Sequence, residues 1–288
     1  RELKVDDFAP RLSFFFCCTM EFFEEIAKFR AARRIYANIM KNRFHAKNAK
    51  SWHLRFHVQT SGESLTAQQV DNNIIRVTSQ AMAAVLGGCQ SLHTNSRDEA
   101  LALPTEESVK IALRTQQVIA AETGIAKTVD PVGGSHYVEY LTSRIEEEVQ
   151  KYLKKIDRMG GALVAIERGF FQEEIRRNAY NMKKEIDTKK RTIVGVNKYQ
   201  DSSSIEPKLN VIDTEIESKQ RSKLKNLRDS RDKSKFEHSI SSLQKAAEQD
   251  DKNLMPFIVE AVRNRATLGE IANSFREIYG IFEPRVTF

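Results

Sequence analysis

The sequence predicts an α/β protein that contains half of a (β/α)8 barrel of the TIM type, followed by a mainly helical carboxyl-terminal extension. Up to about residue 156, short runs of β-forming residues alternate with amphipathic helical stretches, as in parallel βαβ units. The runs recur roughly every 36 to 42 residues, and four units at that spacing make half of an eight-unit barrel. Beyond the fourth unit the pattern changes to successive helices.

Four runs have the length and residue types of buried or half-buried strands. They are Leu12 to Phe16, Leu54 to Gln59, Cys89 to Thr94 and Ile125 to Val129. The stretches between them carry ordinary helix-end signals. Thr105, for example, stands as an N-cap before Glu106 and Glu107 in an acidic first turn, and that helix is expected to end at Gly124.

This pattern divides the chain into three parts. Residues 1–146 form the half barrel with its four βα units, residues 147–204 form a helical extension of the barrel, and residues 205–288 form a charged linker and carboxyl-terminal helices. Within the last part, Thr267 and Glu270 have the spacing of a capping box before the final helix.

Composition places the chain among soluble globular proteins, because 40% of its 288 residues are hydrophobic and 30% are charged. No apolar run approaches the roughly 20 residues that cross a bilayer, and the first residues lack a signal-peptide core. We therefore expect a cytoplasmic protein without a membrane partner. The three cysteines lack the spacing of a disulfide framework or a metal site, and we interpret them as buried thiols.

The net charge of +7 allows an anionic partner, and a nucleotide-bearing thioester would be one. Much of the positive charge lies in Lys183 to Arg191 and in Lys219 to Lys235, where acidic residues are interspersed and aromatic residues are absent. Nucleic-acid binding and a solvated helical face are both compatible with such segments. The lack of aromatic residues favours the solvated face, so no nucleic-acid partner is expected.

Strand alternation sorts the side chains of the second run onto two faces. Leu54, Phe56 and Val58 share one face, and Arg55, His57 and Gln59 share the other. The outer face of a barrel strand packs against helices and is apolar, so the polar face is expected to point into the barrel. Gln59 is then nearest the carboxyl end of the strand, where the active sites of barrels lie.

The other runs also present polar side chains. Arg11 and Ser13 together suit an anionic or carbonyl-bearing ligand, although Arg11 could instead pair with Asp7. The third run leads into His93 and then Glu99, and loops past the strand ends of a barrel carry function. His93 fits a structural hydrogen-bonding role as well as a catalytic one, and Glu99 could cap a helix or accept hydrogen bonds from hydroxyl groups.

The sequence lacks GxGxxG, Walker, GxSxG, HExxH and CxxC motifs, but a longer segment indicates a family. Arg55-Phe56-His57-Val58-Gln59-Thr60-Ser61-Gly62 closely resembles a barrel strand of methylmalonyl-CoA mutases. The resemblance spans about residues 6 to 200 and includes, in order, Phe8 to Phe15, Gln90 to Asn95, Asp98 to Thr105, Asp130-Pro131 with Gly134-Ser135, and Gly195 to Tyr199. It implies the carboxyl-terminal half of the barrel of a large catalytic subunit, of the two-subunit type without the cobalamin-binding domain.

This resemblance implies an isomerase that uses adenosylcobalamin to rearrange the carbon skeleton of an acyl-CoA by radical chemistry. Methylmalonyl-CoA and succinyl-CoA are the expected pair, because that branch of the family is the commonest. Isobutyryl-CoA and 2-hydroxyisobutyryl-CoA mutases share the same features and stay open as alternatives. A truncated, inactive fragment or an assembly partner is a further alternative.

The same resemblance assigns the candidate site residues. The residues matching positions that hold the acyl-CoA are Arg11, Ser13, Lys50 and Gln90. Those matching positions near the corrin or the adenosyl group are His57, Gln59, Gly62, Glu99 and Ala102. His57 and Gln59 are also the expected catalytic residues, and Glu99 is expected to accept hydrogen bonds from ribose hydroxyls. No metal ligand is expected in this chain.

The chain also departs from the family pattern. Many members have tryptophan at the position of Glu63 and proline-tyrosine at Val70-Asp71, so the loop that faces the cofactor is expected to differ in shape. Glu63 should be exposed or paired, because a buried unpaired carboxylate is costly. The earlier barrel strands and the cobalamin-binding domain, with its cobalt-ligating histidine, have no counterpart here. We expect them in a separate amino-terminal barrel half and a separate cobalamin-binding small subunit.

Overall fold

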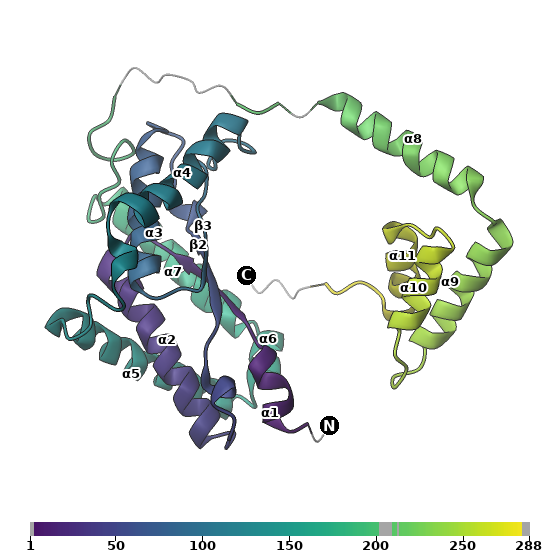
Figure 1. The fold of residues 1–288 in the computed structure, drawn as a ribbon, viewed down its shortest axis with the longest axis horizontal. Coiled ribbons are helices and arrows are strands. Elements are labelled where there is room, and N and C mark those ends of the chain that lie inside the picture. The colour runs from purple at the N-terminus through teal and green to yellow at the C-terminus, as the bar shows by residue number, and fades with distance from the viewer. Residues whose placement is uncertain (1–2, 202–208, 212, 284–288) are drawn as a thin grey trace. The chain divides into compact units, whose positions relative to one another are not determined.

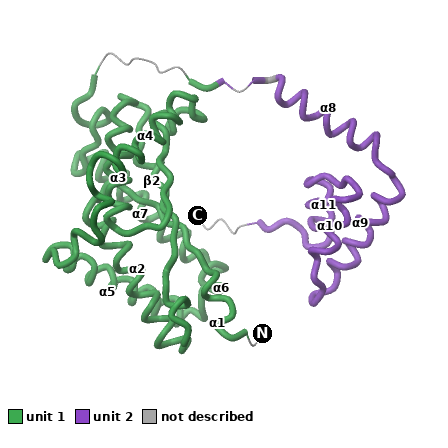
Figure 2. Tube along the Cα trace, in the orientation of Figure 1, with its two compact units in different colours: residues 1–210 green, residues 211–288 purple. Residues whose placement is uncertain are grey.

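The computed structural model describes residues 3–201, 209–211 and 213–283, and the chain is drawn in Figure 1. It forms two compact units, residues 1–210 and residues 211–288, which Figure 2 distinguishes by colour. The boundary expected between residues 204 and 205 lies outside the described residues.

A small parallel sheet organises the first unit, with its strands in the order β1-β2-β3. The strands are β1 (Phe14–Cys18), β2 (Phe56–Thr60) and β3 (Ser91–His93). Three predicted strands are therefore confirmed, and each begins two residues later than expected. The architecture agrees with the α/β class and with part of a barrel followed by helices.

The fourth predicted strand is wrong. Ile125–Lys127 form a 3-10 turn, η4, and Val129 is 93% exposed. A strand needs a neighbour to pair its backbone groups, and within the described chain no segment pairs with this run. Its β-forming residues therefore do not produce a strand, and the first unit has three strand–helix units in place of the four expected.

Helices make up most of the first unit. The longer ones are α2 (Phe22–Asn42), α3 (Asn72–Leu86), α4 (Glu106–Glu122), α5 (His136–Arg158) and α7 (Phe170–Asp187). The short ones are α1 (Val5–Phe8), α6 (Ala162–Glu167) and the 3-10 turns η1 (Ala9–Arg11), η2 (Ala49–Trp52) and η3 (Gly62–Ser64). Thr105 caps α4 as expected, because its side chain accepts a hydrogen bond from the Ser108 backbone N–H.

The core of the first unit lies between one face of the sheet and helices α2 and α3. Phe56 and Val58 on β2 are buried there with Phe29 from α2. The rings of Phe29 and Phe56 stack with centroids 5.4 Å apart. A Cβ on Gly87, at the end of α3, would stand 2.5 Å from Phe29 Cδ2, so this close approach requires glycine. The apolar face of the sheet is thus covered.

The opposite face of the sheet is left uncovered by the residues that the structure describes in this unit. Phe15 on β1 is 64% exposed, and Cys17, two residues further on, is exposed as well. Cys18 points to the core, where its thiol donates a hydrogen bond to the Gln80 backbone carbonyl. Burial there raises the pKa of the Cys18 thiol. The expectation of buried thiols is therefore wrong for Cys17, because successive side chains on a strand point to opposite faces.

The second unit is helical throughout its described residues. It contains α8 (Thr214–Ser230), α9 (Lys233–Ala247), α10 (Met255–Arg263) and α11 (Leu268–Tyr279). Leu243, Ala261 and Ile271 form its buried core, one from each of the last three helices. None of the helices described in either unit is long and apolar enough to cross a membrane.

The predicted capping box at the start of α11 is present and has a further partner. Thr267 Oγ1 accepts from the Glu270 backbone N–H, and the Glu270 carboxylate accepts from the Thr267 backbone N–H. Arg231 donates to both carboxylate oxygens of Glu270 at 2.8 Å. The Arg231 guanidinium and the cap hydrogen bonds hold the pKa of Glu270 at about 2, against an ordinary value of 4.5.

We predict that acid weakens the second unit through Glu270. Because the folded-state pKa of Glu270 is lowered, its contribution to the free energy of unfolding is complete above pH 4.5 and is lost as the pH falls towards 2. Glu270→Gln should cost roughly 2 kcal/mol at pH 7, after allowing for solvent screening. Hydrogen exchange of the α11 amides at several pH values measures this. Glu237→Gln, on the exposed side of α9, is the control, and equal effects of the two changes would refute the assignment.

Candidate functional site

The uncovered face of the sheet carries the polar side chains that alternation predicted. Parallel pairing aligns Phe15, His57 and Ser91 in one row across the strands, and Cys17, Gln59 and His93 in the next. The opposite face of β2 is buried, with Phe56 at 2% exposure. The expected division of β2 into an apolar and a polar face is therefore confirmed.

His57 is held between its two neighbours in the first row. Its Nδ1 lies 2.7 Å from Ser91 Oγ on β3. Its ring lies against the Phe15 ring on β1, with centroids 4.8 Å apart and planes tilted by 40°. No residue in the described part of the chain hydrogen-bonds to Nε2, so that nitrogen is available to a ligand.

Gln59 is joined to the loop that follows β3. Gln59 Nε2 donates to Asn95 Oδ1 at 2.9 Å, and the Asn95 backbone N–H donates to Thr60 Oγ1 at 2.9 Å. Asn95 is only 2% exposed, and its Nδ2 is buried without a hydrogen-bond partner in the described structure. A buried amide donor without a partner is costly, which makes Asn95 Nδ2 a candidate ligand contact.

Gly62, Asn95 and Glu99 meet just beyond the carboxyl ends of β2 and β3. A Cβ added to Gly62 would stand 3.0 Å from Asn95 Nδ2 and 3.3 Å from Glu99 Cγ. We call these three residues the carboxyl-end cradle. It combines an amide donor, a carboxylate acceptor and a bare backbone position, a set that suits a ligand bearing hydroxyl groups.

The loop with Glu99 and Ala102 is anchored to the start of α4. Buried Asp98 accepts from the Thr105 backbone N–H at 3.1 Å, and its own carbonyl accepts from the Ala102 backbone N–H at 3.1 Å. Ala102 is half-buried, while Glu99 is exposed. The loop therefore keeps Glu99 at the carboxyl end of the sheet without enclosing it.

The predicted acyl-CoA residues lie at the other end of the strands. Arg11 and Ser13 directly precede β1, and both are exposed. Arg11 forms no ion pair with Asp7 or with any other residue that the structure describes, so the alternative pairing is absent. Its guanidinium is free to meet an anion.

Lys50 lies on η2, before β2, in a loop that Asp6 holds. Asp6 accepts from the backbone N–H of Lys47 at 2.9 Å and from Ser51 Oγ at 2.7 Å. These hydrogen bonds, the Lys47 contact foremost, keep the pKa of Asp6 below its usual value. Lys50 itself is exposed, and within the described chain its ammonium group has no ion pair.

Gln90, just before β3, already uses much of its hydrogen-bonding capacity. Its Oε1 accepts from the Phe56 backbone N–H at 2.7 Å, and its Nε2 donates to the Gly88 carbonyl at 3.0 Å. These contacts extend the sheet at its amino end. One amide hydrogen and one lone pair are left for a ligand.

The predicted residues thus fall into two groups along the direction of the strands. Arg11, Lys50 and Gln90 stand before the strands, and the carboxyl-end cradle stands after them. Five strand residues at about 3.3 Å each separate the groups by roughly 16 Å. Contact with both groups would require an elongated ligand or two ligands placed end to end.

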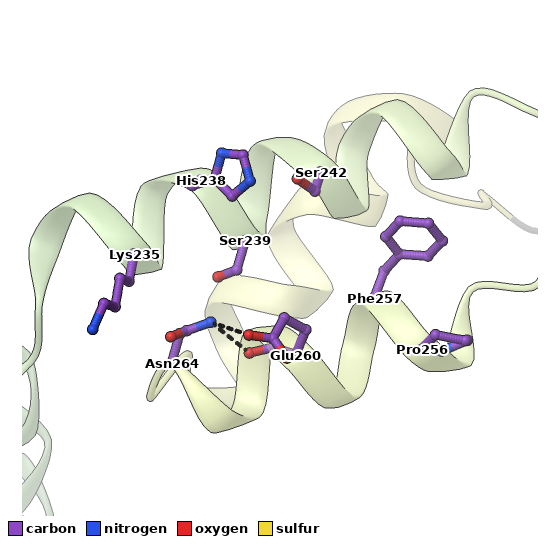
Figure 3. Close-up of a pocket in the computed structure, with 8 residues that line it drawn as sticks. All are labelled: Lys235, His238, Ser239, Ser242, Pro256, Phe257, Glu260 and Asn264. Atoms are coloured by element: carbon purple, nitrogen blue, oxygen red, sulfur yellow. Dashed lines mark hydrogen bonds between the residues drawn. The ribbon is translucent and has the colours of Figure 1, made fainter.

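A separate cavity occurs in the second unit. It has a volume of about 450 Å³ and is lined by residues of α9 and α10 and of the segments at their ends, among them His238, Phe257 and Glu260, as Figure 3 shows. Glu260 is already the acceptor of a hydrogen bond from Asn264. None of the predicted site residues lines this cavity.

The residues where the chain departs from the family pattern include one carboxylate whose exposure was expected. Glu63 is exposed, which avoids the cost of a buried carboxylate. Asp71 pairs with Arg97 at 2.8 Å, and Arg97 also reaches Glu107 at 3.1 Å.

Sequence reasoning did not single out Ser91 and Asn95. Ser91 lies within the third predicted strand, Cys89 to Thr94, and Asn95 directly follows that strand, so the polar residues at its end were the available signal. Their partners depend on the strand register, which puts Ser91 opposite His57 and continues two residues past His93 to Asn95. A single sequence does not give that register.

The chain is similar to known proteins over nearly its whole length. The family model for methylmalonyl-CoA mutase matches residues 1–281. The chain is 42% identical to the large subunit of 2-hydroxyisobutanoyl-CoA mutase from Aquincola tertiaricarbonis, over 99% of the chain and 51% of that protein. It is 45% identical to mouse mitochondrial methylmalonyl-CoA mutase, over 96% of the chain and 37% of that protein. A Streptomyces virginiae methylmalonyl-CoA mutase large subunit is 43% identical, over 96% of the chain and 39% of that protein.

The chain therefore spans about half or less of the length of these relatives. Both the family match and the relatives cover the sheet, the carboxyl-end cradle and the helices of the second unit. On this evidence, the chain belongs to the methylmalonyl-CoA mutase family.

Proposed function

We propose that this chain is one part of an adenosylcobalamin-dependent acyl-CoA mutase that interconverts methylmalonyl-CoA and succinyl-CoA. The main support for this proposal is the placement of the polar and charged residues around the sheet. Two exposed cationic residues, Arg11 and Lys50, precede strands β1 and β2, and the carboxyl-end cradle, in which a buried amide has no partner among the described residues, follows strands β2 and β3. The basic end suits the phosphates of coenzyme A, and the cradle suits the hydroxyl groups of an adenosyl moiety.

The residues present fit the expected cofactor. Asn95 Nδ2 is a buried donor without a partner, Glu99 supplies a carboxylate acceptor, and Gly62 leaves the space that a Cβ would fill. When bound, adenosylcobalamin supplies the radical chemistry of the rearrangement. The chain's own residues hold and orient the bound groups. Gln59 keeps Asn95 in place, and His57 Nε2 is available to orient the acyl group.

Acyl-CoA is the proposed substrate class at the amino end. Arg11 and Lys50 are both exposed and without ion pairs among the described residues, and Ser13 lies beside them in sequence. A guanidinium binds phosphate oxygens in pairs, while an ammonium group binds them as a point charge. Gln90 contributes its remaining amide hydrogen.

Partner chains are part of the proposal. The sheet has open edges on β1 and β3 and one uncovered face, and such edges favour pairing with further strands. Two relatives are named as large subunits. We propose a separate cobalamin-binding small subunit and a separate amino-terminal barrel half, with the assembly in the cytoplasm and no nucleic-acid partner.

A second candidate substrate has its own support. The relative that matches 99% of the chain is named for 2-hydroxyisobutanoyl-CoA. That substrate and isobutyryl-CoA also carry the coenzyme A group that the amino end of the face suits. An inactive fragment or an assembly partner would keep the same fold without turnover, so activity separates these alternatives.

Reconstitution tests the proposed reaction. The chain, a polypeptide with the earlier barrel strands and a cobalamin-binding small subunit should together convert methylmalonyl-CoA into succinyl-CoA, and only when adenosylcobalamin is added. Product is measured by chromatography of the thioesters. If the assembly turned over 2-hydroxyisobutyryl-CoA or isobutyryl-CoA faster, that thioester would replace methylmalonyl-CoA as the proposed substrate. If none of the three thioesters were turned over, the alternative of an inactive fragment or an assembly partner would be favoured.

We predict that Gly62→Ala impairs the carboxyl-end cradle. The added methyl group would crowd Asn95 Nδ2 and Glu99, so binding of 5′-deoxyadenosine by the assembled protein should weaken about tenfold, or roughly 1.4 kcal/mol. Isothermal titration calorimetry measures it. Gly269→Ala is the matched control, because a Cβ there meets nothing within 4 Å. Unchanged binding in Gly62→Ala would argue against the cradle.

Arg11→Ala should weaken the binding of propionyl-CoA. Loss of a charge-assisted hydrogen bond to a phosphate should raise the Kd roughly tenfold or more. The increase should be smaller at high salt, because salt screens the attraction between the guanidinium and the phosphate. Fluorescence competition against a labelled coenzyme A measures both. Arg114→Ala on α4, whose guanidinium contacts Gln117, is the control. Equal losses in the two variants would indicate a nonspecific effect of charge.

A further inference from the structure

We infer that Ser91 is a positioning residue for His57: its hydroxyl donates to Nδ1, which fixes the orientation of the imidazole and keeps the proton on Nε2. The inference deepens the proposed function, since it takes His57 as a residue that meets the acyl-CoA. It rests on contacts within the described sheet.

The strand register brings the two side chains together. His57 is the residue paired with Ser91 between β2 and β3, and with Phe15 between β1 and β2. Residues paired across neighbouring strands lie on the same face with their Cβ atoms close. Ser91 Oγ therefore approaches one edge of the imidazole, and the Phe15 ring lies against it from the other strand.

The hydrogen bond joins a group that can donate to a nitrogen that can accept. The separation of 2.7 Å between His57 Nδ1 and Ser91 Oγ is a hydrogen-bond length, and we assign the hydroxyl as its donor. Within the described structure, the Ser91 hydroxyl has no other hydrogen-bond partner, so its proton is free to point at Nδ1. A neutral imidazole whose Nδ1 accepts carries its proton on Nε2.

This arrangement determines what His57 offers to a ligand. Nε2 has no partner among the described residues, and as an N–H group it donates. The thioester carbonyl and the carboxylate oxygens of an acyl-CoA are acceptors, so the donor form is the one that fits. Without Ser91, the contact with the Phe15 ring would not favour either tautomer of His57, because a ring contact does not distinguish Nδ1 from Nε2.

Near-isosteric replacements isolate the hydroxyl. Ser91→Thr keeps it, Ser91→Val removes it with nearly the same shape, and both β-branched residues suit a strand. The long-range proton–nitrogen NMR spectrum of the full chain reports the state of each His57 nitrogen, with His57→Gln identifying the signals. We expect a protonated Nε2 and an unprotonated Nδ1 in the native protein and in Ser91→Thr. Ser91→Val should show a mixture of the two tautomers.

Binding of propionyl-CoA to the assembled protein gives the second measurement. Ser91→Val should weaken it about fivefold relative to Ser91→Thr, the range of one hydrogen bond. Ser79→Ala on α3, whose hydroxyl donates only to the Ile75 carbonyl of its own helix, should leave both measurements unchanged.

Three outcomes would overturn the inference: a protonated Nδ1 in the native chain, identical His57 nitrogen signals in the Thr and Val variants, or equal affinities of those variants for propionyl-CoA. Failure of the proposed function looks different. In that case no variant and no native assembly binds propionyl-CoA, while the His57 nitrogens still respond to removal of the Ser91 hydroxyl.

Discussion

Burial of Phe56 against Phe29 is the interaction on which the site depends. It fixes which face of β2 is covered by α2 and α3, and period-two alternation then puts His57 and Gln59 on the opposite face. A shift of one residue in β2 would reverse both faces and bury the polar side chains. The large cost of burying an imidazole and an amide without partners opposes that shift. The aromatic core therefore determines the chemistry of the uncovered face.

Much of this could be predicted from the sequence, because alternation is a local property. Leu54, Phe56 and Val58 are apolar at every second position, and the structure buries all three. The same holds for the helix ends, since Thr105 and Thr267 act as N-caps through contacts with residues only three positions away. Signals that depend on neighbours in the chain were thus sufficient for three of the four predicted strands, for these caps and for the polar face of β2.

The features that were missed depend on distant residues. Asn95 becomes a candidate ligand contact only when β3 pairs with β2 in one register, and Ser91 reaches His57 for the same reason. Cys17 and Cys18 are neighbours of the same residue type, yet Cys17 is exposed and Cys18 is buried, because they point to opposite faces of β1 and only one face is packed against helices. Register and strand ends are set by tertiary packing, to which a single sequence gives no direct access.

The missing fourth strand and the uncovered polar face have a common cause. The prediction of a strand at Ile125 to Val129 rested on its β-forming residues and on the spacing of the runs, and neither shows whether a neighbouring strand is present. Within the described residues this segment has no such neighbour, so its backbone turns and Val129 remains exposed. The His57 face likewise lacks the opposing strands that would exclude water from it. Partner strands of the kind proposed would satisfy both deficits, since closure of a barrel pairs its edges and encloses its inner face in the same step.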